Sequence, residues 1–250
     1  MVVFNRNIMN RMMMKYMKNV IFIFAILLTF TACERDEYYQ DGGKAVAKFN
    51  GDMLQYLESK PVPFDTIAQL VKLAGLEETF KNETFTFFAP SDEYIKQTIG
   101  TIHTDGLNRR LYNLDKDTVI NLSDIHPLIW RKYLQRYMFK DANLLKDYPQ
   151  IDFGQKLMFP GQLYYAYDKS VFNIGVEFGD ANGIKYIGYR SILISYIPDI
   201  SRPDDNWRTT RVSSSDIQPK NGVVHTLQWD GGNFGFIREE FFDEVINNTN

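Results

Sequence analysis

Apolar residues recur at helical spacing in the first half of the chain body. The first set is Phe49, Met53, Leu54 and Leu57. Apolar positions repeated every three to four residues form the buried side of a helix. A second helix is predicted over 65–75, with Asp65 as its N-cap and Gly75 as its C-terminal stop. A third follows Ser123 or Asp124, and its apolar stripe is Trp130, Tyr133, Leu134, Tyr137 and Met138.

A short strand separates the second helix from the third. Residues 84–88 predict this strand, and Pro90 ends it because proline lacks a backbone donor. Ser91 is predicted to cap a short helix, whose first turn holds two acids that suit the helix dipole. Residues 100–122 are polar and irregular, and we expect them to form an inserted loop.

After Tyr148 the pattern changes to short β-branched or aromatic runs separated by turns. These runs are 157–159, 163–167, 171–178, 186–197, 209–213 and 223–229. Asn182-Gly183 predicts a hairpin turn, residues 201–206 a loop, and residues 239–246 a closing helix. Helices first and strands later indicate an α+β domain. We expect its N-terminal helices to pack on an antiparallel β-sandwich or wedge.

The start of the chain resembles the export signal of a bacterial lipoprotein. Basic residues precede an apolar run over 20–30, and a small pair leads directly to Cys33, the single cysteine. The run is shorter than the roughly 20 apolar residues of a membrane span. We therefore expect residues 1–32 to be a signal peptide and Cys33 to be acylated, for example with palmitate. Residues 33–48 would then form a tether; an uncleaved anchor helix is the alternative.

Charge and cysteine content exclude several classes of protein. Without residues 1–32 the chain has 24 basic and 31 acidic residues, a formal charge of −7. Such a chain lacks the clustered cations that phosphate contacts need, so we expect no nucleic-acid partner. A lone cysteine excludes an intrachain disulfide, and about 200 residues suffice for one domain with its own core. We place this domain at 49–250, with insertions near 100–122 and 198–208.

Two segments together resemble the fasciclin (FAS1) domain family. Residues 84–94, TFTFFAPSDEY, are similar to the box TFFAPSDEAF, and residues 216–227 are similar to the box DI…NGVVHVID. Residues 64–75 and 134–138 stand where the family has two further motifs, although Met138 replaces a family histidine. The resemblance covers most of residues 50–237 and implies a FAS1-like fold with a role in adhesion or matrix contact.

Packing explains the two boxes without a ligand. The motif residues that we expect to be structural are Phe87, Phe88, Ala89, Pro90, Ser91, Asp216, Asn221, Gly222, Val223, Val224 and His225. The Asn221-Gly222 pair is predicted to supply positive φ for a tight turn. His225 stands alone on an apolar strand, which is typical of a hydrogen-bonded core residue.

No pattern indicates catalysis, and we expect neither an enzyme nor a bound metal or cofactor. The three histidines lack metal-ligand spacing, and phosphate-loop, dinucleotide and nucleophile-elbow motifs are absent from the sequence. The neighbouring acids Asp204-Asp205 and Glu239-Glu240 would point apart rather than form a glycosidase pair. Residues 115–124 are rich in oxygen ligands for calcium but lack EF-hand spacing.

Noncovalent binding at a cell surface is the function that the sequence favours. We expect an outer-membrane lipoprotein of a Gram-negative bacterium, whose FAS1-like module adheres to an extracellular protein or glycan. The alternative is an accessory glycan-binding lipoprotein of a polysaccharide-uptake system. Trp207, predicted to be the most exposed tryptophan, is the candidate sugar contact. Asp117-Thr118-Val119 resembles an O-glycosylation triplet of some anaerobic Gram-negative bacteria, with Thr118 as acceptor.

Overall fold

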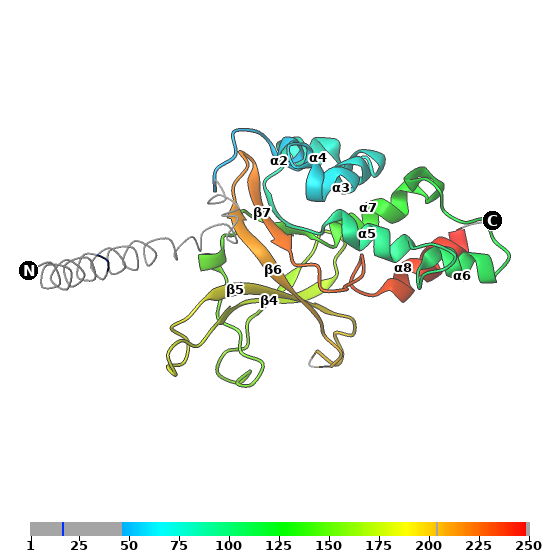
Figure 1. Cartoon of the computed structure of the whole chain (residues 1–250). Helices are drawn as coiled ribbons and strands as arrows, with labels where there is room; N and C mark the ends of the chain where they lie inside the picture. The colour runs from blue at the N-terminus through cyan, green and yellow to red at the C-terminus, as the bar shows by residue number, and fades with distance from the viewer. Residues whose placement is uncertain (1–16, 18–46, 204, 249–250) are drawn as a thin grey trace, which may run out of the picture. The chain divides into compact units, whose positions relative to one another are not determined.

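The structure is a computed structural model that describes residues 17, 47–203 and 205–248 of the chain (Figure 1). The chain divides into two compact units, Met1–Lys44 and Ala45–Asn250, and all described residues except Met17 belong to the second. Cys33, the expected signal peptide apart from Met17, and nearly all of the expected tether lie outside the described residues. Where the structure is described, no helix is long and apolar enough to cross a membrane.

Seven α-helices lie within the described part of the chain. They are α2 (Met53–Glu58), α3 (Pro61–Leu73), α4 (Glu77–Asn82), α5 (Asp92–Ile99), α6 (Leu107–Asn113), α7 (Pro127–Gln135) and α8 (Arg238–Asn248). Short 3-10 turns occur at Leu122–Asp124 and Leu145–Asp147. Figure 1 shows α2, α3 and α4 as one group and α5 to α8 as another. Helix α3 contacts both α5 and α7, so it joins the two groups.

Among the described residues, seven strands form one mixed sheet in the order β2-β1-β7-β6-β5-β4-β3. They are β1 (Phe85–Ala89), β2 (Met138–Lys140), β3 (Gln162–Tyr165), β4 (Val171–Phe178), β5 (Arg190–Ile197), β6 (Arg208–Ile217) and β7 (Gly222–Leu227). The predicted combination of N-terminal helices with a sheet is confirmed. A wholly antiparallel sheet is wrong, because β1 and β7 pair in parallel. This pairing joins the two sequence boxes, with Phe88 opposite His225.

The sheet curls until its two edge strands approach each other. Strand β6 changes register between Val212 and Ser214 and again before Ile217, and such bulges bend a strand. Its first half pairs with β5 and its second half with β7. At the edges, Phe139 of β2 forms a bridge with Ala166, which follows β3. The sheet is therefore nearly closed.

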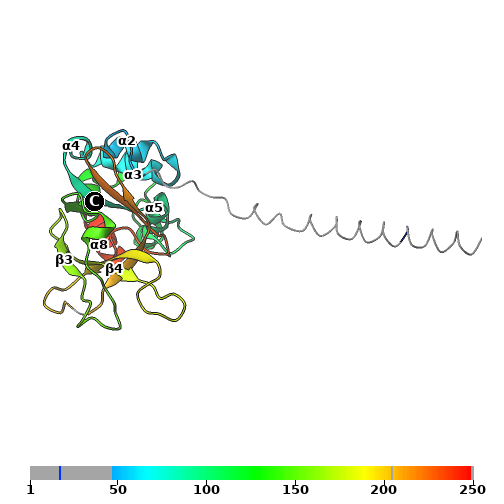
Figure 2. The same cartoon turned by 90° about the vertical axis from the view of Figure 1, so that its left-hand side faces the viewer.

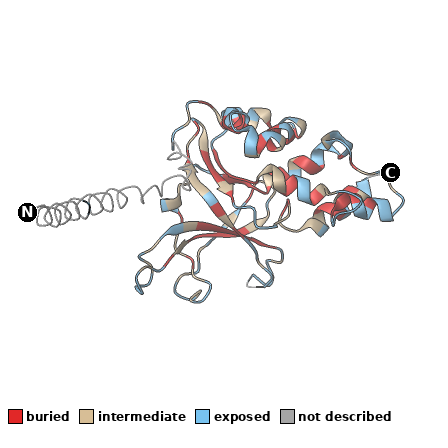
Figure 3. Ribbon diagram, viewed as in Figure 1, coloured by how far each residue is buried: buried red, intermediate tan, exposed pale blue. Residues whose placement is uncertain are grey.

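Aromatic side chains pack on both faces of β1. Phe80 of α4 meets the rings of Phe85 and Phe87 edge-on, at centroid distances of 5.1 and 5.0 Å. Phe88 points to the other face and contacts Phe139 at 5.4 Å, because successive side chains of a strand alternate between faces. The core thus lies both between helices and sheet and inside the curled sheet, as the buried segments of Figure 3 show.

The predicted helix boundaries have mixed outcomes. Gly75 has a φ of 65° and ends α3 with the paired backbone hydrogen bonds of a Schellman motif, so the predicted stop is confirmed. Asp65 is not an N-cap. Helix α3 begins earlier, at Pro61, and the Asp65 carboxylate accepts a hydrogen bond from Gln69 at 3.0 Å. Ser91 occupies the N-cap position of α5, but its side chain makes no capping hydrogen bond.

Two segments differ from the predicted pattern for the middle of the chain. Residues 100–122 are not wholly irregular, because they contain α6, whose buried Leu107 and Leu111 are four residues apart. The stripe that begins at Trp130 is buried throughout, but α7 ends at Gln135 and Met138 opens β2. An apolar pattern alone does not distinguish the end of a helix from the start of a buried strand.

The strand predictions for the second half hold better. Five of the six predicted runs overlap β3 to β7, whereas residues 157–159 form no strand. Asn182 and Gly183 both have positive φ, 53° and 77°, between the bridged residues Ala181 and Ile184. This is the geometry of a type I′ hairpin turn, so the predicted hairpin between β4 and β5 is confirmed.

Candidate ligand-binding site

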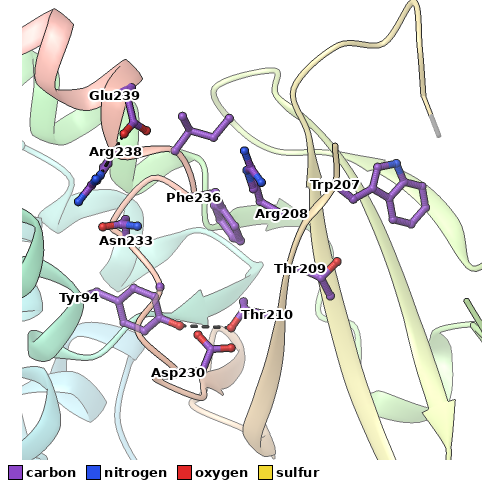
Figure 4. Close-up of a pocket in the computed structure, with 12 residues that line it drawn as sticks. Tyr94, Trp207, Arg208, Thr209, Thr210, Asp230, Asn233, Phe236, Arg238 and Glu239 are labelled. Carbon is purple, nitrogen blue, oxygen red and sulfur yellow. Dashed lines mark hydrogen bonds and ion pairs between the residues drawn. The ribbon is translucent and has the colours of Figure 1, made fainter. Parts of the chain in front are cut away.

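A cleft of about 450 Å³ opens between the start of β6 and the connection from β7 to α8 (Figure 4). This volume lies within the range of about 300–1,000 Å³ that small-ligand pockets occupy. The side chains that define its polar and apolar character are Tyr94, Arg208, Thr210, Asp230, Asn233 and Phe236. They come from α5, β6 and the β7–α8 connection, so only the folded chain brings them together.

The β7–α8 connection is fixed from behind by the helices. The backbone N–H of Phe234 donates to Thr98 Oγ1 at 2.9 Å, and that of Gly235 donates to the Tyr137 hydroxyl at 2.7 Å. Gly235 has a φ of 78°, and a Cβ there would lie 2.5 Å from the ring of Tyr133. One wall of the cleft is therefore preformed, which lowers the ordering cost of binding a ligand.

A buried charged cluster centred on Arg136 supports the same connection. Its guanidinium donates to the Gly235 carbonyl at 2.8 Å, to Glu240 at 2.8 Å and to Asp168 at 3.1 Å. The side chains of Arg136 and Asp168 are 5% and 4% exposed. Burial of this kind makes the loss of either partner costly, because the remaining charge would be left without compensation.

Tyr94 lies in the cleft as a neutral phenol. Its hydroxyl donates to the Gln228 carbonyl at 2.7 Å and lies 3.2 Å from Thr210 Oγ1 (Figure 4). Burial raises the pKa of Tyr94 to about 12; the hydrogen bond with Thr210 lowers this pKa, and the charge of Asp230 raises it. The phenol is thus uncharged near neutral pH and does not repel an anion.

The cleft holds paired charges at one end and two charges without a protein partner. Arg238 contacts Asp105 at 2.7 Å and Glu239 at 3.0 Å. Burial alone would raise the pKa of Glu239, but the guanidinium of Arg238 outweighs it and lowers this pKa. Within the described chain, the side chains of Arg208 and Asp230 make no hydrogen bond or ion pair. Figure 4 shows them well apart, with Asp230 beside the Tyr94 hydroxyl.

Trp207, the predicted sugar contact, borders the cleft but packs against protein. The Lys156 ammonium lies 3.7 Å from the centre of an indole ring, and Phe153 lies 5.9 Å away in a T-shaped arrangement. The indole N–H donates to the Pro203 carbonyl, and Figure 4 shows the ring directed away from the other labelled side chains. Trp229 is 42% exposed, whereas Trp207 is half-buried and therefore less exposed than Trp229. The prediction that Trp207 is the most exposed tryptophan is wrong because neighbouring loops cover it.

Asp216 and His225 of the second sequence box hold the segment that follows β2. His225 accepts at Nδ1 from the Asp216 N–H at 3.2 Å, and its Nε2 lies 3.0 Å from the Asn143 carbonyl. The Asp216 carboxylate accepts from the Leu145 N–H at 2.7 Å. Burial lowers the pKa of His225 to about 4, although the Asn143 carbonyl and Asp216 favour its charged form. With both ring nitrogens engaged, His225 fixes a loop and offers no free atom to a ligand.

Asn221 and Gly222 connect β7 to the helices and to β1. Asn221 accepts from the Met53 N–H at 2.8 Å and donates to the Phe80 carbonyl at 2.8 Å. A turn does lead into β7 here, with the Gly222 N–H donating to the Pro219 carbonyl at 3.4 Å, but neither Asn221 nor Gly222 has positive φ, so the predicted positive φ is wrong. Glycine is needed for a different reason: a Cβ at 222 would lie 2.1 Å from the carbonyl oxygen of Phe85 in the adjacent strand.

The remaining motif residues lie in or next to the two parallel strands. Buried residues among them are Phe87, Phe88, Ala89, Pro90, Val223 and Val224, and Ser91 is half-buried. None of these described residues lines the cleft. The sequence boxes and the cleft are therefore separate features of the fold.

The other side chains that could bind a metal ion or take part in catalysis do not lie together in one site. In the described ranges, no group of three or more His, Cys, Asp or Glu side chains is arranged to hold a metal ion. His103 is exposed, and His126 accepts the Leu128 N–H at 3.2 Å to cap α7. Glu239 pairs with Arg238, whereas Glu240 pairs with the buried Arg136. Asp204 of the other acidic pair lies outside the described residues.

Thr118, the predicted glycosylation acceptor, is half-buried in the segment that follows α6. Asn108 holds this segment in place: its side chain accepts from the Val119 N–H at 2.7 Å and donates to the Val119 carbonyl at 2.9 Å. Acylation of Cys33 and glycosylation of Thr118 stay predictions.

Sequence reasoning found Trp207 but missed its neighbour Arg208 and the two residues opposite, Asp230 and Asn233. No local pattern marks them, since they belong to separate segments. The glycine-containing stretch after β7 signals a turn, but not that the turn forms a cleft wall. No sequence signal marks Arg136 either, because a single arginine usually lies in solvent.

Comparison with solved structures found 15 chains that match this one. No family model matches the chain, and no curated protein matches it. A solved structure of a FAS1 domain pair from the insect cell adhesion molecule fasciclin I is similar over 72% of this chain, with 17% identity and a TM-score of 0.46. The chain spans 50% of that structure's length. At this level of similarity the description of the fold rests on this chain's own strands and helices.

Proposed function

We propose that the protein is a lipid-anchored binding protein of the bacterial outer membrane, with a FAS1-like module that adheres noncovalently to an extracellular protein. The observation that carries this proposal is an apolar surface on three loops, at 152–159 between β2 and β3, at 179–189 between β4 and β5, and at 199–207 between β5 and β6. We call it the loop-end surface and define it by its exposed members Phe153, Leu157, Met158, Ile184, Ile187 and Ile200.

The three loops form one surface because their side chains hold them together. The loop at 152–159 contacts the 179–189 loop through the Tyr186 hydroxyl, which lies 2.9 Å from both Asp152 and Gln155. It contacts the 199–207 loop through Trp207. Figures 1 and 2 show these loops projecting on the side of the sheet away from α2, α3 and α4. Contiguous exposed apolar side chains of this kind mark interaction sites.

The 199–207 loop and Lys48 lie next to opposite ends of β6. Lys48 forms a bridge with Gln218, just after the last residue of β6. Trp207 directly precedes the first residue of the same strand. Ten residues of strand span about 30 Å at roughly 3.3 Å per residue.

Charge favours a protein partner over an anionic lipid surface. The loops at 152–159, 179–189 and 199–207 contain three basic and five acidic residues. A lipid-binding loop cluster needs an excess of Lys and Arg, whereas protein interfaces combine aromatic and Met side chains with a polar rim.

Adhesion of beads that carry the full chain tests this proposal. We expect beads to adhere to cells, and the adhesion to be lost when proteases strip the cell-surface proteins. Leu157→Asp should weaken adhesion at least about fivefold, or ~1 kcal/mol, because the new charge would be desolvated at the contact. The matched control is Ile120→Asp, since Ile120 is also highly exposed but lies outside the loop-end surface. Protease-resistant adhesion, or equal effects of the two substitutions, would contradict the proposal.

The anchor is tested separately. Cys33→Ser should release the protein from membranes into the soluble fraction. A variant that stays membrane-bound and uncleaved would instead show that the leader is an anchor helix.

A further inference from the structure

The cleft has features that adhesion through the loop-end surface does not use. Its unpaired cation, Arg208, and its unpaired anion, Asp230, lie apart on different segments. The Asn233 side chain also makes no hydrogen bond within the described chain. Between them lie the hydroxyls of Tyr94 and Thr210 and the half-buried ring of Phe236. Polar groups left open in a preformed cleft are the usual basis of orientation and specificity for a small ligand.

We propose that this cleft binds an acidic saccharide, a sugar ring that carries a carboxylate. Arg208 would bind the carboxylate through its planar fork of N–H donors, the geometry that suits such an anion. Asp230 and the Asn233 side chain would accept and donate hydrogen bonds to ring hydroxyls. The ring of Phe236 would pack against the apolar face of the sugar.

The residues that line the cleft favour a carboxylated sugar over a neutral sugar and over a phosphate. A neutral sugar would leave the Arg208 guanidinium unpaired inside the complex, which costs binding energy. A phosphate would meet one free cation but also the free carboxylate of Asp230. A carboxylated sugar has both an anion for Arg208 and several hydroxyls for Asp230. The neutral phenol of Tyr94 repels neither the carboxylate nor the hydroxyls.

Supporting contacts keep the two sides of the cleft in place before any ligand arrives. The Tyr94 hydroxyl bonds to Gln228 at the start of the β7–α8 connection. Thr209, next to Arg208, lies with its hydroxyl 2.8 Å from that of Ser195 in β5. The binding energy of the ligand would thus not be spent on ordering these segments.

Calorimetric titration of the full chain in detergent tests the proposal with a matched pair of ligands. Methyl glucuronide and methyl glucoside share one ring and differ in the carboxylate. We expect the glucuronide to bind, and Arg208→Gln to weaken its binding about tenfold or more, which corresponds to 1.4 kcal/mol. Asp230→Ala should weaken it by a smaller factor. The control is Arg202→Gln, because Arg202 is an exposed arginine already paired with Asp199 at 3.0 Å.

Several outcomes would overturn the proposal. They are equal binding of glucoside and glucuronide, unchanged glucuronide affinity in Arg208→Gln, and equal losses in Arg208→Gln and Arg202→Gln. Galacturonide is titrated in parallel to cover the epimeric ring. Absence of binding by both uronides up to about 10 mM, where a site with a Kd near 1 mM would be mostly filled, also rejects it.

Because Arg208 is exposed and unpaired, the Arg208→Gln variant should keep its fold, which circular dichroism checks. Adhesion through Leu157 is independent of all these results.

Discussion

Replacing Arg136 removes the centre of the buried charged cluster. In the variant Arg136→Met, Asp168 keeps its hydrogen bonds from the Ser170 N–H and hydroxyl, at 3.0 and 2.7 Å, but loses its cation. Breaking a buried ion pair by removing one partner costs about 3–5 kcal/mol. Because Ser170 still solvates the carboxylate, we expect the lower end, about 3 kcal/mol of unfolding free energy. Methionine preserves much of the side-chain volume, so the loss of unfolding free energy reflects mainly the removal of the positive charge at 136.

Urea unfolding followed by circular dichroism measures this loss. The control is Lys132→Met on the same helix, whose partner Glu244 lies at 2.5 Å. These two side chains are 47% and 27% exposed, and such surface pairs contribute about 0–1 kcal/mol. The double variant Arg136→Met/Asp168→Asn should recover part of the loss, because no uncompensated carboxylate remains at 168.

Two results would refute this reasoning. One is a loss in Arg136→Met as small as that in Lys132→Met. The other is a double variant whose loss equals the sum of the two single losses, since that would mean that Arg136 and Asp168 do not interact.

Two further predictions concern the sequence boxes. The native pKa of His225, about 4 against the usual 6.5, means that the unfolded chain binds the proton first. Stability should therefore fall as pH drops from about 6.5 to about 4, by roughly 3 kcal/mol, and urea titrations should show a smaller fall in His225→Gln; identical falls would exclude this origin. Gly222→Ala should lower the thermal midpoint more than Gly154→Ala, because a Cβ at 222 would lie 2.1 Å from the Phe85 carbonyl oxygen, whereas a Cβ at 154 would meet only a side-chain oxygen of Asp152 at 3.2 Å. Equal midpoints would contradict that close approach.

Local features were the most predictable part of the fold. Gly75 and Asn182-Gly183 could be placed from sequence because positive φ is a property of the backbone that few residues tolerate. The errors occurred where a distant segment decides the conformation. Asp65 has the chemistry of an N-cap, yet the prolines before it start the helix earlier. Gly222 looked like a turn glycine, but the neighbouring strand requires it.

The candidate site was less predictable than the fold. Trp207 could be named from its place after a polar loop, but its exposure depends on Lys156 and Phe153, which lie about fifty residues earlier in the chain. Arg208 gives no signal of its own. An arginine becomes a candidate ligand contact only when it lies in a cleft without a protein partner. The residues next to Arg208 in the sequence do not show which distant segments form that cleft.

The sequence by itself determined the class of fold, most of the helices and strands, the two boxes and the expected export signal. These depend on short-range periodicity and on residue types whose backbone preferences are fixed. Only the tertiary structure decided that β1 and β7 pair in parallel, that His225 and Asp216 hold a loop, and that Arg208 and Asp230 line one cleft. Such juxtapositions depend on which surfaces bury each other best, a property of the whole chain that no local window contains.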